Sequence, residues 1–254
     1  MKNFKLLLIV LIFCSNISTG HAEETIKLAS GEWAPYQSEK LKYFGVASRI
    51  VTEAFKISGI QVKYGYFPWN RSLNLAKKGK WDGTFLWFDT PERRKYFYIS
   101  EPVVDIQYVF FHLKKFSFNW ENVNDLKGIN IGGTVGYNYE KKFQDAEKSK
   151  LITVNRIDSD EQNFKKLLAG RIQIFPNDLD AGLELIHKHF KPEDQKKITY
   201  HVKPTRAAPH HLLLSKKKKK NDKMIEFFNK GLKDLKESGK IDIYLSESRQ
   251  GKYR

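Results

Sequence analysis

Hydrophobic positions along the chain follow two spacings, one typical of strands and one typical of helices. Residues 46–58 are apolar at near-helical spacing, and Gly59 follows them, as glycine commonly does just past a helix. We expect further helices over 69–77, 160–168, 179–189 and 224–236, and a glycine-rich turn with a helix over 133–146. Strands are expected over 25–28, 61–66, 82–88, 106–113, 129–132, 152–154 and 172–175, with an extended segment over 199–214. This alternation favours an α/β fold with a mainly parallel sheet.

The predicted elements fall into two similar α/β blocks. The extended segments near 106–113 and 200–214 are the natural connections between these blocks. Two lobes joined by two strands form a hinge. We therefore expect one lobe from residues 23–106 and 203–254, and a second lobe from residues 107–202.

The first 22 residues predict an export signal. Lys2 and Lys5 precede an unbroken apolar run over 6–13, and the stretch ending in Ala22 supplies a cleavage site. A run this short cannot cross a bilayer core, which needs roughly 20 apolar residues. A buried N-terminal helix is the alternative. Cleavage after Ala22 would leave a chain located in the periplasm.

Cys14 is the single cysteine of the chain and lies inside the predicted signal. A lipoprotein signal places its cysteine after a small residue, whereas Phe13 is bulky, so lipid anchoring is disfavoured. Cleavage after Ala22 leaves the mature chain without cysteine. That excludes disulfides, thiolate metal sites and cysteine nucleophiles.

The formal net charge is +16, and removal of Lys2 and Lys5 leaves +14. A nucleic-acid binder is one interpretation of this excess. The basic residues, however, are spread along the chain, and the dense run at 216–220 lies between an apolar strand and a helix. A solvated turn explains that run better, so we expect no nucleic-acid partner. Attraction to an anionic membrane surface or to an acidic ligand stays open.

Catalytic motifs are missing from the sequence. It contains no Gly-x-Ser-x-Gly elbow, no P-loop and no His-Glu-x-x-His. His187 and His189 are two apart on a predicted helix and do not share a face. His210 and His211 are adjacent in an extended segment, where neighbouring side chains point opposite ways. We expect no enzyme activity, no cofactor and no metal site.

A set of short motifs runs through nearly the whole mature chain, in one order. They are Gly31-Glu32-Trp33-Ala34-Pro35-Tyr36, Phe67-Pro68-Trp69, Lys80-Trp81-Asp82-Gly83, Thr90-Pro91-Glu92-Arg93, Ser100-Glu101-Pro102, Leu126-Lys127-Gly128 followed by Ile131-Gly132, and Ala169-Gly170-Arg171-Ile172. In this order they resemble the periplasmic solute-binding proteins of family 3, the amino-acid-binding type. The resemblance implies the type II periplasmic binding protein fold, with a ligand cleft between two α/β lobes.

The resemblance also implies a pair of charged ligand residues. It places Arg93 on the ligand's carboxylate, which a planar guanidinium suits, and Asp178 on the ligand's ammonium. Such a clamp would hold a zwitterion only when the cleft is shut, so that binding drives closure. The alternatives are a surface salt bridge of Arg93 or Arg94, and a helix-capping role for Asp178.

Other matching positions would line the cleft. Trp33 and Trp69 match positions that form its side walls, with core packing as the alternative. Arg71 could reach the same cleft as a second cation. Thr134 and Asn138, in the glycine-rich turn, match positions that touch ligand, and backbone N–H groups at a helix start bind anions.

Phe88 departs from the family pattern, which often has serine there. The missing hydroxyl removes one hydrogen bond to a carboxylate, typically about 0.5–1.5 kcal/mol net. The pocket is therefore expected to be more aromatic than the usual amino-acid site.

The sequence thus predicts a monomeric protein that captures a small polar solute, an amino acid or a related compound, for an ABC-type membrane transporter. A protein of the same fold that senses a ligand and docks on a membrane receptor is the alternative, because the two differ mainly on outer surfaces.

Overall fold

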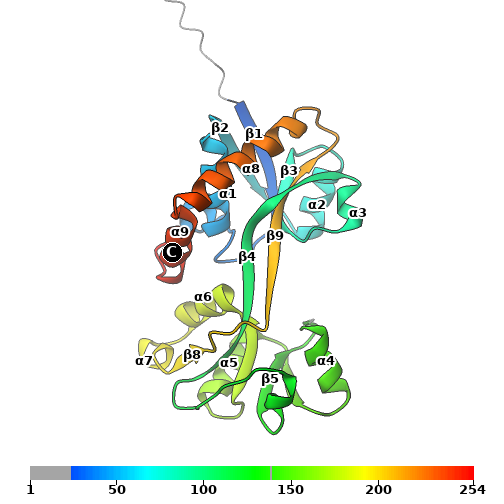
Figure 1. The fold of residues 1–254 in the computed structure, drawn as a ribbon. Coiled ribbons are helices and arrows are strands. Elements are labelled where there is room, and N and C mark those ends of the chain that lie inside the picture. The colour runs from blue at the N-terminus through cyan, green and yellow to red at the C-terminus, as the bar shows by residue number, and fades with distance from the viewer. Residues whose placement is uncertain (1–23, 138) are drawn as a thin grey trace, which may run out of the picture.

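The computed structural model describes residues 24–137 and 139–254, which fold into two α/β lobes (Figure 1). The first lobe contains β1 (Glu24–Ser30), a 3₁₀ helix (Lys42–Phe44), α1 (Val46–Lys56), β2 (Ile60–Tyr66), α2 (Trp69–Lys77), β3 (Gly83–Trp87), α3 (Pro91–Arg94), α8 (Asn221–Glu237) and α9 (Lys240–Arg249). The second lobe contains a 3₁₀ helix (Val123–Leu126), β5 (Asn130–Thr134), α4 (Lys141–Lys148), β6 (Thr153–Ile157), α5 (Asp160–Leu168), β7 (Ile174–Asp178), α6 (Leu179–His189), α7 (Pro192–Gln195) and β8 (Ile198–Tyr200).

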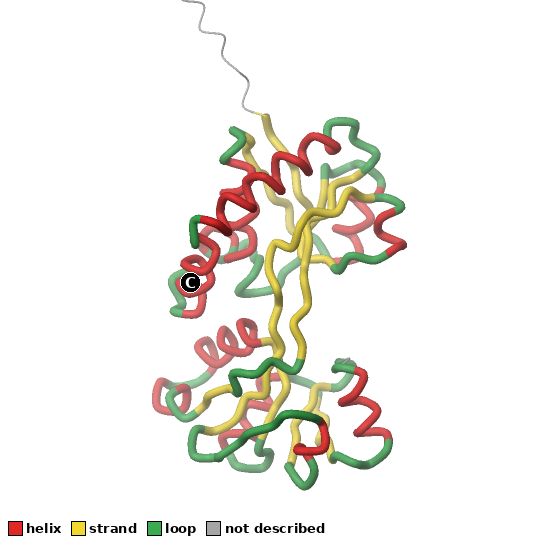
Figure 2. Tube along the Cα trace, in the orientation of Figure 1, coloured by secondary structure: helices red, strands yellow, loops and turns green. Residues whose placement is uncertain are grey.

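Two long antiparallel strands, β4 (Phe97–Leu113) and β9 (Arg206–Ser215), connect the lobes (Figure 2). β4 pairs with β9 in the first lobe and continues into the second, where it pairs with β7 and β8. Hydrogen bonds join the strands in the order β2-β1-β3-β9-β4-β7-β5-β6. β1, β2 and β3 are parallel, as are β5, β6 and β7. β1–β3 and β5–β7 thus pair in parallel, whereas β4 and β9 pair antiparallel with each other and with their neighbours in each lobe.

The core of the first lobe forms where α1 packs on α8. Ile50, Val51 and Ala54 lie on one face of α1 and are fully buried. Gly231 lies inside α8. A Cβ at this position would be 2.0 Å from the carbonyl oxygen of Ala54. The two helices can approach this closely because residue 231 has no side chain.

Aromatic rings form the centre of the second lobe. Phe111 on β4, Phe164 on α5 and Phe175 on β7 are all fully buried. Their ring centroids are 5.1 and 5.2 Å apart in edge-to-face contacts, the arrangement that aromatic quadrupoles favour. This packing fixes α5 against β7, so that α5 begins and β7 ends at the space between the lobes.

Several elements match the expected spans, and others differ. α2, α5 and α6 cover 69–77, 160–168 and 179–189, as expected. β4 begins at Phe97 rather than near 106. The helix expected within 133–146 begins only at Lys141, and ahead of it the Thr134 N–H donates to the Tyr139 hydroxyl. α9 was not expected: the left-handed conformation of Gly239 ends α8, and a second helix then begins.

The lobes also touch along one edge, where α9 approaches α6. Arg249 Nε lies 2.6 Å from Asp180 Oδ1, and Arg254 Nη2 lies 2.8 Å from Glu184. The buried hydroxyl of Tyr36 donates to Asp178 Oδ1 at 2.8 Å. Each of these bonds joins the first lobe to the second.

The division into 23–106 plus 203–254 and 107–202 places its boundaries inside β4 and shortly before β9; it stays a prediction. The predicted export signal and Cys14 lie outside the described residues. Across residues 24–137 and 139–254, no helix is both long and apolar enough to cross a membrane.

Candidate ligand-binding site

A cavity of about 380 Å³ lies between the lobes, beside the connecting strands. Trp33 lines it from the first lobe, and the remaining lining residues come from the second lobe and the connecting strands. These residues are Tyr108, Gly136, Tyr137, Tyr139, Asp160, Asn177, Asp178, Ala181 and Arg206. Aromatic walls with a few charged groups are typical of small-molecule sites of this size.

Asp178 lies at the end of β7 and caps α6. Its Oδ1 accepts hydrogen bonds from the N–H groups of Asp180 (2.9 Å) and Ala181 (3.1 Å), and from the Tyr36 hydroxyl. Its Oδ2 is buried and has no hydrogen-bond partner among the described residues. Capping uses Oδ1 and leaves Oδ2 for the predicted ligand role, so the two roles of Asp178 do not compete.

Burial of the Asp178 side chain, helped by the nearby Asp180 charge, raises the pKa of its carboxyl to about 7. The hydrogen bonds from Ala181, Tyr36 and Asp180 lower the pKa but do not offset burial. A carboxylate in this position is stabilised by an added positive charge, because burial penalises its ionised form. The site thus favours a cation beside Oδ2.

Asp160, the first residue of α5, is the second carboxylate of the cavity. It accepts hydrogen bonds from Thr134 Oγ1, from the Tyr137 hydroxyl (3.1 Å) and from Asn177 Nδ2 (3.3 Å). Thr134 is only 3% exposed and also accepts from Asn163. Thr134 therefore positions Asp160, and its own contact with ligand stays a prediction.

The glycine-rich turn does not form the expected anion site at a helix start. α4 begins only at Lys141. The Thr134 N–H donates to the Tyr139 hydroxyl at 2.8 Å, and the Val135 N–H donates to the Ile157 carbonyl at 3.0 Å. These two N–H groups are therefore already hydrogen-bonded within the second lobe. Asn138 lies outside the described residues.

Three tryptophans form one wall on the first lobe. The ring centroids of Trp33 and Trp69 are 5.9 Å apart, and those of Trp69 and Trp87 are 5.1 Å apart. A Cβ on Gly31 would lie 2.5 Å from the Trp69 ring, so this position requires glycine. Trp33 and Trp69 both pack against the core while half-buried. Trp33 lines the cavity, and Trp69 supports it from behind.

Arg93 lies at the far end of this tryptophan wall. Its Nη1 donates to the Phe88 carbonyl at 2.6 Å, and its guanidinium carbon lies 4.7 Å from the Trp87 ring centroid. Among the described residues it pairs with no carboxylate, whereas Arg94 pairs with Asp89. Partial burial lowers the pKa of Arg93. Arg94 thus forms the surface salt bridge, and Arg93 has no ion-pair partner among the described residues.

Phe88 and His210 extend the aromatic surface. Their ring centroids are 4.5 Å apart, and His210 is 5.5 Å from Trp33. Burial lowers the pKa of His210 to about 4, so its ring is neutral at neutral pH. Arg71 is exposed and lies 5.3 Å from the Phe67 ring, outside the cavity lining. Its expected place in the cleft stays a prediction.

Several residues that line the cavity or contact its lining were not picked out from the sequence. Tyr36 lay within a quoted motif without an assigned role, and Tyr108 and Arg206 come from opposite connecting strands. Asp160 follows the N-cap Ser159 and lies in the first turn of α5, where acidic residues are common, so its sequence context did not mark it as a site residue. No local signal marks these residues, because only the strand register and the packing of α5 bring them together.

A hinge of two strands and a cavity lined from both lobes define a two-lobed α/β protein that holds a small ligand between its lobes. The profile of the bacterial extracellular solute-binding proteins, family 3, matches residues 27–247. The chain therefore belongs to this family, and the predicted resemblance and fold class are confirmed. The predicted role in solute capture is confirmed with them. No curated protein sequence matches the chain.

Solved structures give the same fold. Substrate binding domain 2 of Lactococcus lactis GlnP, in an open conformation, aligns with a TM-score of 0.74 at 19% identity, over 89% of this chain and 96% of that chain. The unliganded, open L-cystine solute receptor of Neisseria gonorrhoeae aligns with a TM-score of 0.72 at 19% identity, over 91% and 94%. The second substrate binding domain of a putative amino acid ABC transporter from Streptococcus pneumoniae aligns at 0.73 and 19%, over 88% and 99%. At these identities the likeness shows the fold.

Proposed function

We propose that the protein captures an α-amino acid in the cavity between its lobes. The observation that carries this proposal is Asp178, a lining residue of the cavity whose buried Oδ2 has no partner among the described residues. An α-ammonium group would supply the missing donor and the missing charge together. The Asp160 carboxylate on the same cavity adds to the attraction for a cation.

The ligand's carboxylate would bind the cationic side of the site. Arg206 lines the cavity, where its guanidinium lies 4.3 Å from the Tyr108 ring centroid, and it forms no ion pair with any described residue. Arg93 also lacks a carboxylate partner in that part of the chain. We propose that closure about β4 and β9 brings Arg93 over the ligand, so that Arg93 and Asp178 clamp it. The aromatic wall around Trp33 would hold the ligand's side chain.

Three finer points belong to the same proposal. The protein binds its ligand without chemical change, acts as a monomer in the periplasm after loss of residues 1–22, and delivers the ligand to an ABC-type membrane transporter. Family membership supports the binding role. A solved relative from an amino acid ABC transporter supports the membrane partner. Within the described residues, no group of His, Cys, Asp and Glu side chains could hold a metal ion.

A thermal-shift screen of amino acids, followed by titration calorimetry of the best ligand, tests this function. A ligand that binds only the folded state raises the melting temperature by linkage. Arg93→Ala and Asp178→Asn should each weaken binding by about tenfold or more, because each removes a charge-assisted hydrogen bond. Arg94→Ala is the matched control, since Arg94 pairs with Asp89 outside the cavity.

Two outcomes would contradict the proposal. One is a screen in which no α-amino acid changes the melting temperature. The other is full affinity in Asp178→Asn. Loss of affinity in Arg94→Ala equal to that in Arg93→Ala would overturn the clamp while leaving the cavity as the site. Turnover of any bound amino acid would contradict a pure binding role.

A further inference from the structure

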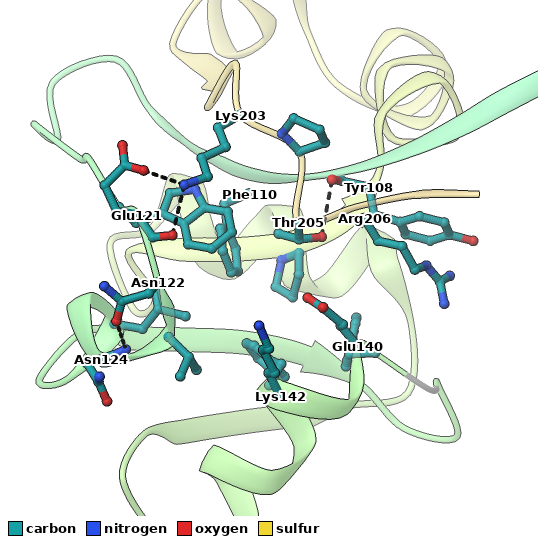
Figure 3. A pocket seen from close by; sticks show the side chains of 17 residues that line it. Tyr108, Phe110, Glu121, Asn122, Asn124, Glu140, Lys142, Lys203, Thr205 and Arg206 are labelled. Carbon is teal, nitrogen blue, oxygen red and sulfur yellow. Dashed lines mark hydrogen bonds and ion pairs between the residues drawn. The ribbon is translucent and has the colours of Figure 1, made fainter. Parts of the chain in front are cut away.

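A second cavity, of about 470 Å³, lies in the second lobe beside the connecting strands (Figure 3). It is larger than the cavity between the lobes. Its apolar walls come from β4, residues 120–126, the start of α4, β7, and residues 203–206 ahead of and at the start of β9. The apolar lining residues are Phe110, Trp120, Val123, Leu126, Phe143, Pro176 and Pro204.

These walls are preformed by packing. Phe110 is 1% exposed, and its ring centroid lies 5.1 Å from that of Trp120 in an edge-to-face contact. The 3₁₀ helix beside Trp120 begins with a capping box, in which Asn122 and Asp125 satisfy each other's backbone N–H groups. A cavity with such walls does not need a ligand in order to form.

Polar groups at this cavity include donors without acceptors. The Trp120 Nε1 atom is buried and has no hydrogen-bond partner in the described ranges. In Figure 3 the side chains of Lys142 and Glu140 point from α4 into the space, and neither forms an ion pair with another described residue. On the opposite rim, Lys203 is already paired with Glu121.

Charge at the rim favours an anion. Three cations line the cavity (Lys142, Lys203 and Arg206) against two carboxylates (Glu121 and Glu140). The chain as a whole is strongly basic, which raises the local concentration of anions. An apolar neutral molecule would fill the walls but would not supply the acceptor that the buried indole N–H lacks.

We propose that this cavity is a second ligand site, which binds a small aromatic or branched apolar molecule carrying one carboxylate. The apolar walls would cover the body of the ligand. The carboxylate would accept from the Trp120 indole N–H and the Lys142 ammonium. This site adjoins the cavity between the lobes, because Tyr108, Tyr139 and Arg206 line both cavities and Arg206 lies over the Tyr108 ring.

The test uses para-fluorophenylacetate as the probe, titrated into the full protein and followed by fluorine NMR. We expect saturable binding, and weaker binding of para-fluorobenzyl alcohol, which keeps the ring and lacks the carboxylate. Lys142→Gln should weaken binding of the acid by about tenfold. Lys141→Gln is the matched control, because Lys141 is exposed, pairs with Asp145 and does not line the cavity.

Two further variants locate the probe. Val123→Phe should block binding by filling the cavity, whereas Asp178→Asn, which alters the other cavity, should leave it unchanged. No saturable binding up to about 10 mM would overturn the proposal, as would equal affinity for the alcohol or full affinity in Lys142→Gln. Loss of probe binding in Asp178→Asn but not in Val123→Phe would place the probe between the lobes and would also overturn it. None of these outcomes depends on which amino acid the protein binds.

Discussion

Replacement of Asp178 by asparagine should remove one source of pH dependence from the stability of the unliganded protein. The carboxyl has a pKa of about 7 in the folded protein, against 3.8 as its ordinary value. The folded state therefore binds more protons than the unfolded state between these two values. Stability contributed by this group is present at low pH and is lost as pH rises toward the folded pKa.

The size of the effect follows from the two pKa values. One pKa unit corresponds to about 1.36 kcal/mol, so between about pH 5 and about pH 8 the wild-type protein should lose about 2–3 kcal/mol of unfolding free energy through Asp178. Asparagine keeps an oxygen to accept from Tyr36 and from the helix amides. Its amide nitrogen replaces the unpartnered Oδ2 and would be left unpaired, at about 1–3 kcal/mol, but this cost does not vary with pH.

Urea unfolding of both proteins at the two pH values measures this difference. The variant should be less stable than or similar to wild type at the lower pH, and should gain about 2–3 kcal/mol relative to wild type at the higher pH. Asp242→Asn, an exposed substitution on α9, should follow wild type at both values. Parallel loss of stability in wild type and Asp178→Asn would refute the argument that burial holds this carboxyl protonated.

Three other predictions concern packing and charge. Arg249→Ala leaves the buried Asp180 without its ion-pair partner and should lower the unfolding free energy by about 2 kcal/mol; an unchanged urea midpoint would contradict this. Gly231→Ala places a methyl group 2.0 Å from the Ala54 carbonyl oxygen and should cost about 1–3 kcal/mol in the same assay. His210 should titrate near pH 4 when its ring signals are followed by NMR, because burial favours the neutral ring; a midpoint near its ordinary value would show that water reaches it.

The sequence predicted best those helices whose ends are fixed by residues next to them, such as N-caps. The helix over 160–168 follows Ser159, whose side chain caps it, and the helix over 179–189 follows the cap at Asp178. α4 starts late because the Thr134 N–H bonds to the Tyr139 hydroxyl, a contact that hydrophobic periodicity does not encode. α9 has weak amphipathic periodicity, and its last turn is held by the ion pair of Arg249 with Asp180 on the other lobe.

The site was predictable only where a motif carried it. Trp33 and Asp178 both match ligand-site positions of the family pattern, and both line the cavity. Arg206 and Tyr108 face each other only through the register of β4 with β9. Asp160 joins them because the aromatic core holds α5 against β7. Convergence of distant segments is a property of the fold and leaves no local trace in the sequence.

The tryptophan wall described above gives this molecule its own optical reporter. Trp33, Trp69 and Trp87 form a chain of contacts with centroids 5.9 and 5.1 Å apart, close enough for their electronic transitions to couple. A ligand that touches Trp33 would therefore alter the near-ultraviolet circular dichroism of the whole chain of indoles. Trp120 belongs to the other cavity and is not part of that chain. Occupancy of the two cavities can thus be followed in one unlabelled sample, with Trp120→Phe to separate the two signals.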